Sequence, residues 1–168
     1  MPDQKRRELA QYRLEKAEEC YLAARQLYEG NLLRDSANRS YYAIFHAVRA
    51  ILALDDVDFK KHSGVISYFQ QHYIKTQIFD VRFSHYLRDA FSIRQNSDYE
   101  DFYIISRDET KTQLLHAREL LDTVHLYVVA GEKESLISKH GMSCIATCRV
   151  FFYLCRGRRP RRPAQGAL

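Results

Sequence analysis

Proline is absent from residues 3–159 of this chain of 168 residues. Proline breaks helices and glycine weakens them, yet the whole chain has only three Pro and six Gly. Apolar residues recur at three- and four-residue spacing, and no segment alternates apolar and polar residues as a half-buried strand would. The sequence therefore predicts long amphipathic helices.

Five helical segments are predicted from this periodicity. Their expected bounds are about 5–29, 32 or 33 to 54, 63–75, 79–97 and 107–130. Gly30 is a stop signal for the first, Ser63 is a candidate N-cap for the third, and Ser106 with Glu109 forms a capping box before the fifth. Residues 96–103 are expected to form a loop. The predicted fold class is all-α, an up-and-down bundle of four to five helices.

The C-terminal part differs in composition from the rest. Residues 1–132 are expected to form the helical domain, and residues 133–168 a basic, cysteine-containing extension that is poorly ordered. The formal net charge is +5, but residues 137–168 hold seven Lys or Arg and no acid. The body of the chain is therefore close to neutral, and nucleic-acid binding inferred from charge alone would rest on the extension.

The four cysteines do not suggest a disulfide framework. Cys20 lies on an apolar helical stripe, and His140, Cys144, Cys148 and Cys155 are too loosely spaced for us to expect a zinc site. No apolar run is long enough to span a membrane, and the N-terminus does not resemble a secretory signal. We expect a cytoplasmic protein with reduced thiols, no bound metal and no cofactor.

The second predicted helix carries a polar line beside its apolar stripe. Arg39 and His46 are seven residues apart, so they lie only about 20° from eclipsed on a helix. Asp35 and Tyr42 fall close to the same line. A helix that presents Arg, Tyr and His on one face is a candidate for binding or catalysis. The apolar stripe on the other side consists of Ala37, Tyr41, Ile44, Val48 and Ile51.

The run from Asn38 to Ala47, NRSYYAIFHA, resembles the signature helix of HEPN domains, in which an Arg is followed after four to six residues by a His. Here six residues separate Arg39 and His46. The run from Arg94 to Glu100 resembles a second marker, an Arg followed by Asp-Tyr. The resemblance covers roughly residues 12–128 and is strongest to small prokaryotic HEPN proteins that are paired with a nucleotidyltransferase.

The resemblance implies a homodimeric, metal-independent endoribonuclease of the toxin–antitoxin type, restrained by a nucleotidyltransferase-fold antitoxin. Arg39 would bind the scissile phosphate of RNA, and His46 would act as general acid or base. The residues expected to shape the site or to contact RNA or nucleotide are Asp35, Ser40, Tyr42, Asp98 and Tyr99.

Each of these residues also has a purely structural interpretation. Arg39 could pair with Asp35 one turn earlier, and His46 could be a hydrogen-bonded interface residue. Asp98 could cap a helix and Tyr99 could pack in a loop. The alternative function is therefore a non-catalytic HEPN module that binds a nucleotide or a partner protein, or that oligomerises.

Two positions depart from the pattern of active HEPN proteins. Ser40 stands where many of them have Asn, Asp or His. Val48 stands where some carry a Tyr to which the antitoxin attaches AMP. Modification of this chain at position 48 is therefore impossible.

Overall fold

The computed structural model describes residues 2–100 and 102–140, and this part of the chain is helical without any strand. The helices are α1 (Pro2–Glu29), α2 (Leu33–Leu54), α3 (His62–Phe69), the π-helical turn η1 (Gln70–Ile74), α4 (Val81–Tyr99) and α5 (Arg107–His140). The predicted all-α bundle is confirmed.

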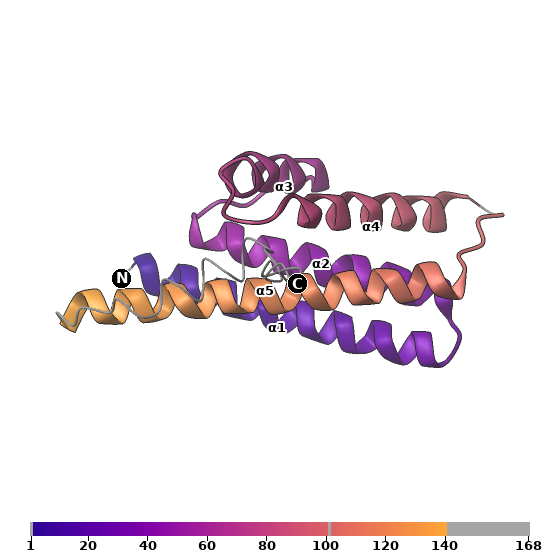
Figure 1. Ribbon diagram of the computed structural model, residues 1–168, viewed down its shortest axis with the longest axis horizontal. Helices are drawn as coiled ribbons and strands as arrows, with labels where there is room; N and C mark the ends of the chain where they lie inside the picture. The colour runs from indigo at the N-terminus through magenta and orange to yellow at the C-terminus, as the bar shows by residue number, and fades with distance from the viewer. Residues whose placement is uncertain (1, 101, 141–168) are drawn as a thin grey trace, which may run out of the picture.

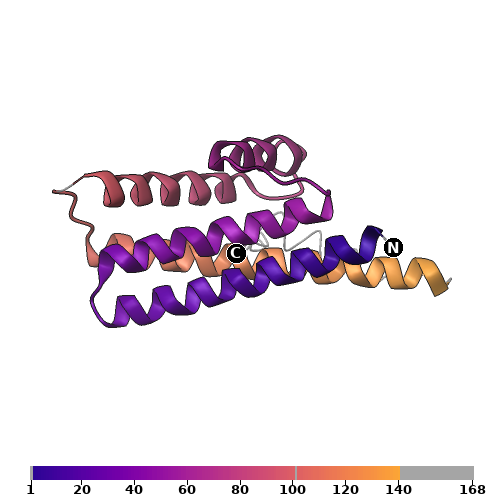
Figure 2. The same cartoon turned by 180° about the vertical axis from the view of Figure 1, so that it is seen from behind.

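Helix α2 lies at the centre of the bundle and contacts α1, α3, α4 and α5. Figures 1 and 2 show α1 along one side of α2 and α4 along the opposite side, and Figure 2 shows α5 behind it. The short α3 lies near the C-terminal end of α2, beside the start of α4. With neighbours in three directions, α2 buries most of its side chains.

The contact between α1 and α2 is built from alanines. On α1 they recur every seven residues, which keeps them on one face of the helix. All of the seam residues are fully buried, and none has a side chain beyond Cβ to hold the two helices apart. The seam therefore allows a closer approach of α1 to α2 than larger side chains would. Its residues are Ala10, Ala17 and Ala24 on α1 and Ala43, Ala47 and Ala50 on α2.

An aromatic cluster packs the end of the bundle at which α2 ends. Phe79 lies at its centre, with its ring 5.7 Å from that of Phe69 and 5.2 Å from that of Tyr127. Tyr73 joins the same cluster, and its hydroxyl donates to Asp55 at 2.5 Å. Burial raises the pKa of Tyr73, and the Asp55 carboxylate raises it further, so the phenol remains protonated. This bond ties η1 to the end of α2.

The helix ends agree with the predicted signals only in part. The capping box before α5 is confirmed, because Ser106 N donates to Glu109 at 2.9 Å and Glu109 N donates to Ser106 Oγ at 3.2 Å. Helix α1 ends next to Gly30, but the left-handed residue there is Asn31, with φ of 60°. The prediction of Ser63 as an N-cap was wrong, since α3 already begins at His62.

Two further boundaries differ from the prediction. Helix α4 continues through Tyr99, so the first part of the predicted loop 96–103 is helical. Helix α5 continues to His140, and Cys144, Cys148 and Cys155 lie outside the described residues. The division of the chain near residue 132 stays a prediction.

The alanine seam predicts a specific sensitivity to side-chain size. Replacing the buried Ala17 by Leu should force α1 away from α2 and lower the free energy of unfolding by about 1–3 kcal/mol. Urea unfolding followed by circular dichroism measures the change. Gln26→Leu places the same side chain on the exposed side of α1 and is the control. Equal unfolding midpoints for the two variants would contradict the close-packed seam.

Candidate functional site

One face of α2 remains uncovered by the helices around it. It contains Asp35 and Arg39, which are exposed, and Tyr42, His46 and Arg49, which are half-buried; we call these five residues the open face. In Figure 2 this side of α2 lies between α1 and α4, with α5 behind. The helical spacing predicted from sequence therefore places Arg39 and His46 on one accessible surface.

Arg39 extends from the open face toward α1. There it lies beside the Cys20 thiol, whose pKa is raised by burial, with Arg39 acting in the opposite direction. No ion pair joins Arg39 to Asp35 in the described part of the chain. The guanidinium is therefore not committed to the carboxylate one turn before it.

His46 is held between two aromatic rings of its own helix. The centroid of its ring lies 6.4 Å from that of Tyr42 and 6.2 Å from that of Phe45. Its Nδ1 is buried and has no hydrogen-bond partner among the described residues, which leaves Nε2 as the ring nitrogen on the solvent side. Burial lowers the pKa of His46, and the positive charge of nearby Arg49 lowers it further. The imidazole is therefore held in its neutral form.

Two more cations near His46 come from α1, which runs antiparallel to α2. Arg13 lies level with Arg49, since Arg13 Nη1 donates to the Arg49 carbonyl at 2.9 Å. Lys16 follows one turn later on α1, and its ammonium pairs with Glu19 at 2.8 Å. Both cations contribute to the lowered pKa of His46, after burial and Arg49. The electrostatic surroundings of His46 thus depend on the packing of α1 against α2.

Asp58, in the loop after α2, joins the two arginines. Arg13 Nη2 donates to its carboxylate at 2.7 Å, and Arg49 Nη2 donates to both of its oxygens at 2.9 Å. These bonds from Arg49 and Arg13 hold the pKa of Asp58 below its usual value, although burial acts in the opposite direction. The carboxylate is therefore charged at neutral pH, and it partly neutralises the cations beside His46.

A stack of rings supports the side of α2 next to the open face. His62, from the start of α3, stacks on Phe45 with a centroid distance of 4.4 Å, and Phe91 of α4 lies 5.9 Å from His62. The Tyr41 hydroxyl and His62 Nδ1 share a hydrogen bond. The Arg49 guanidinium lies 5.9 Å from the Phe45 ring centroid. The aromatic stack fixes Phe45, against which His46 and Arg49 rest.

The other residues expected at the site lie in different places. Ser40 is fully buried and points away from the open face, so any influence on Arg39 would be indirect. Tyr99 is exposed at the end of α4, near the N-terminal half of α2 (Figure 2). The side chain of Asp98 lies outside the described residues. Val48 is fully buried, so position 48 faces the core.

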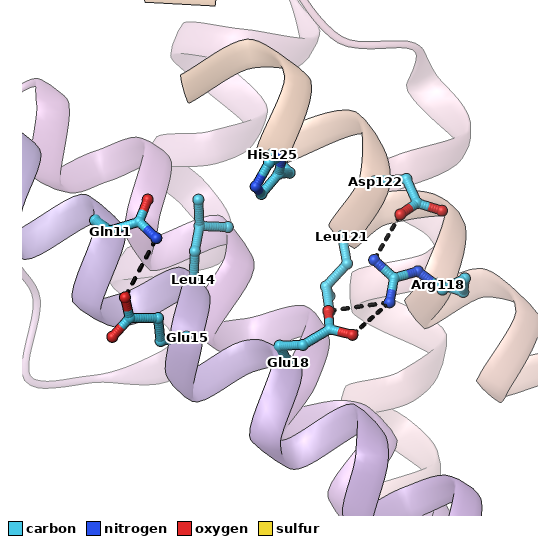
Figure 3. Close-up of a pocket in the computed structure, with 8 residues that line it drawn as sticks. All are labelled: Gln11, Leu14, Glu15, Glu18, Arg118, Leu121, Asp122 and His125. Carbon is cyan, nitrogen blue, oxygen red and sulfur yellow. Dashed lines mark hydrogen bonds and ion pairs between the residues drawn. The ribbon is translucent and has the colours of Figure 1, made fainter. Parts of the chain in front are cut away.

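A groove of the described chain lies elsewhere, between α1 and α5 (Figure 3). It has a volume of about 400 Å³. Arg118 crosses its wall, donating to Glu18 at 2.7 Å and to Asp122 at 2.5 Å. The groove does not include the open face. Within the same described residues, no three His, Cys, Asp or Glu side chains cluster as metal ligands would, and no helix is long and apolar enough to cross a membrane.

Several residues near His46 were not predicted from the sequence. Arg49 could have been found, because it lies three residues after His46 and seven after Tyr42, on the same helical face. Arg13 and Lys16 come from another helix, and Asp58 comes from a loop. Their positions follow from the pairing of α1 with α2, for which the local pattern gives no signal.

The sequence matches the HEPN domain family over residues 10–127. The chain belongs to the HEPN family. It is 32% identical over 117 residues to putative toxin MJ0142 of Methanocaldococcus jannaschii, which covers 70% of this chain and 80% of that protein. It is 36% identical over 93 residues to putative toxin MJ0605 of the same organism, covering 55% of this chain and 69% of that protein. A UPF0332 protein of Thermotoga maritima is 28% identical over 116 residues, covering 69% of this chain and 88% of that protein.

The family predicted from the run Asn38–Ala47 is therefore confirmed. The HEPN match includes the whole open face of α2, and it includes Arg13 and Lys16 on α1 as well as Asp58. The residues that surround His46 thus belong to the HEPN domain itself and not to the extension that follows it.

The surroundings of His46 predict its titration. Because burial and Arg49 lower its pKa, His46 should titrate below the ordinary histidine value of about 6.5, whereas it should titrate near that value in urea. The folded protein then binds a proton less readily than the unfolded chain, so this group costs stability as the pH falls from about 6.5 through the folded pKa. NMR of the ring carbon-bound protons measures both values.

Arg49→Gln removes a positive charge that, after burial, contributes most to the lowered pKa of His46. This variant should therefore raise the pKa of His46 part of the way toward the ordinary histidine value. His46→Gln identifies the signal by its loss. A pKa in the folded protein equal to or above that in urea would contradict the described surroundings of His46.

Proposed function

We propose that this HEPN protein is a toxin-like, metal-independent endoribonuclease in which Arg39 binds the scissile phosphate and His46 transfers the proton. The observation that carries this proposal is the joint presence of both residues on the open face of α2. Arg39 is exposed there, and His46 presents Nε2 on the solvent side.

The reaction suited to these groups is an attack by the ribose 2′-hydroxyl on the adjacent phosphorus. Neutral His46 takes the proton from the 2′-oxygen, which forms a bond to phosphorus while the bond to the 5′-oxygen breaks. The 5′-oxygen leaves with a proton, so the products are a 2′,3′-cyclic phosphate and a 5′-hydroxyl. Arg39 offers two parallel donors to the phosphate oxygens, where negative charge develops.

A single His46 supplies only one of the two proton transfers. The resemblance to HEPN proteins implies a dimer in which two open faces meet, and His46 of the partner subunit would then protonate the 5′-oxygen. The lowered pKa of His46 suits it to act as the base at neutral pH. A proton brought by water could serve the same step in a monomer, at lower efficiency.

The biological setting is proposed from relatives and from the resemblance. Two of the relatives carry the name putative toxin, which supports a toxin-like role for this chain. The resemblance to HEPN proteins paired with nucleotidyltransferases implies an antitoxin of that fold, acting in the cytoplasm. Val48 is an apolar residue in the core, so the antitoxin does not act by attaching AMP at this position.

The decisive test is cleavage of several RNA substrates with EDTA present. We expect His46→Ala and Arg39→Ala each to lower the rate by at least about 10²-fold, because each removes a group that acts in the transition state. The helical circular dichroism should not change, since Arg39 is exposed and His46 is only half-buried. Mass spectrometry of the products should find 2′,3′-cyclic phosphate and 5′-hydroxyl ends.

His125→Ala is the matched control. It removes an exposed histidine of α5 at the edge of the other groove (Figure 3) and should leave cleavage unchanged. A wild-type protein that cleaves none of the RNA substrates would refute the enzyme proposal. It would favour the non-catalytic HEPN module, and the search would then turn to its binding partner.

A further inference from the structure

Arg49 and Asp58 form a second charged position on the open face, on the opposite side of His46 from Arg39. Arg49 Nη2 donates to both carboxylate oxygens of Asp58 at 2.9 Å. Among the described residues, no other acceptor meets a nitrogen of the Arg49 guanidinium, and its Nε is buried without a partner. The guanidinium thus has donors beyond those that Asp58 uses.

The chemistry of this pair is that of an arginine and a phosphate. A guanidinium binds carboxylate and phosphate oxygens through the same parallel donors. Asp58 meets Arg49 through Nη2 alone, so it occupies part of the surface of the guanidinium that a phosphate would contact. Its side chain is 52% exposed, compared with 26% for that of Arg49, so solvent reaches the carboxylate more easily than the guanidinium behind it.

Asp58 can leave Arg49 without opening the bundle. It lies in the loop that joins α2 to α3, outside any helix. Asp56, two residues earlier, pairs separately with Arg6 at 2.9 Å. If Asp58 moves, Arg13 can still donate to the backbone carbonyl of Arg49, which lies 2.9 Å from it. The Arg49–Asp58 pair is partly exposed and therefore weak enough for a phosphate to replace, while the buried Arg13 can keep Asp58 as its partner.

We propose that Arg49 binds a second phosphate of the RNA strand, and that Asp58 occupies this position in the free protein until the strand displaces it. The inference rests on the proposed function, because it extends the same site. The chemical class of ligand is a single strand with at least two phosphates, one on Arg39 and one on Arg49. Lys16 of α1 adds positive charge beside the same stretch.

The spacing of Arg39 and Arg49 on α2 suits an RNA strand with several phosphates better than a single phosphate. Arg39 and Arg49 are ten residues apart, which is about 15 Å along the helix axis. His46 lies between them, about 4.5 Å from the level of Arg49. Arg39 lies beside Cys20 and Arg49 beside Asp58, so a ligand that contacts both arginines where they stand passes the level of His46. Arg49 is then a positioning residue that fixes the strand on the far side of the base.

The test measures binding apart from cleavage. The probe is a short fluorescein-labelled RNA strand that is 2′-O-methylated throughout, so that it has no attacking hydroxyl. Fluorescence anisotropy with the full chain gives the dissociation constant over a range of salt concentrations. Basic residues of the C-terminal extension are present in every variant, so differences between variants report on the helical domain.

Asp58→Asn should bind the probe about two- to fivefold tighter, since the phosphate no longer displaces a charged competitor. Arg49→Gln should bind roughly tenfold more weakly and lower the slope of log K against log salt by about one. Asp58→Asn in the Arg49→Gln background should give no gain. Asp56→Asn makes the same charge change in the same loop and should leave the affinity within experimental error.

Three results would overturn the inference. Unchanged binding by Arg49→Gln would show that Arg49 does not contact a phosphate of the probe. This variant keeps the Arg13–Asp58 pair, so its fold is not at risk. An equal gain in affinity for Asp56→Asn and Asp58→Asn would mean that the effect comes from the overall charge of the protein and not from the position of Asp58. Weaker binding by a folded Asp58→Asn variant would mean that Asp58 holds Arg49 in position for the ligand and does not compete with it. Loss of cleavage alone, with the expected binding pattern intact, would refute the enzyme proposal and support the phosphate position.

Discussion

The enclosure of α2 by α1, α4 and α5 determines where polar chemistry can occur in this protein. Packing on three sides fills most of the circumference of α2 with apolar or small side chains. After its first turn, the charged side chains of α2 lie in the sector from Asp35 to Arg49, because a buried unpaired charge costs several kcal/mol. The HEPN signature uses this sector, and its seven-residue spacing between Arg39 and His46 is what keeps both side chains within it.

The properties of His46 depend on α1 as much as on α2. The alanine seam allows α1 to approach closely, and the register of the two helices places Arg13 and Lys16 beside the imidazole. Burial and positive charge both disfavour a second proton on the ring. A base must be unprotonated before it can act, so the packing that stabilises the bundle also favours the form of His46 that the proposed mechanism requires. Stability and chemistry are therefore linked through the α1–α2 contact.

The sequence was sufficient for the features that depend on local spacing. The helices, the capping box of Ser106 and Glu109 and the shared face of Arg39 and His46 all follow from patterns within a few turns. The sequence was insufficient where several local solutions compete. Both Gly30 and Asn31 can end a helix, and Asn31 takes the left-handed conformation.

Contacts between distant segments could not be predicted at all. In the sequence, Asp58 stands in a run of three aspartates within four residues, which by itself indicates only a turn after α2, because aspartate favours turns. Its bonds to Arg13 and Arg49 span 45 and 9 residues, and they exist only because the loop folds back over both helices. The charge environment of a site is a tertiary property, even when the two residues proposed as catalytic are visible in one helix.

The loop around Asp58 is anchored on both sides of that residue. Before it, Asp55 accepts from Tyr73. Chain reversal at Asp56, with φ of 62°, then directs the following residues back toward α1. After it, Phe59 covers Gly64 so closely that a Cβ at position 64 would lie 2.9 Å from the ring, and only glycine fits there without a shift. With the loop fixed at both ends, rotation of the Asp58 side chain alone can free Arg49 while the backbone remains in place. A carboxylate held this way keeps Arg49 oriented and avoids the cost of leaving a partly buried cation unpaired, and in our proposal a phosphate of RNA takes the place of that carboxylate.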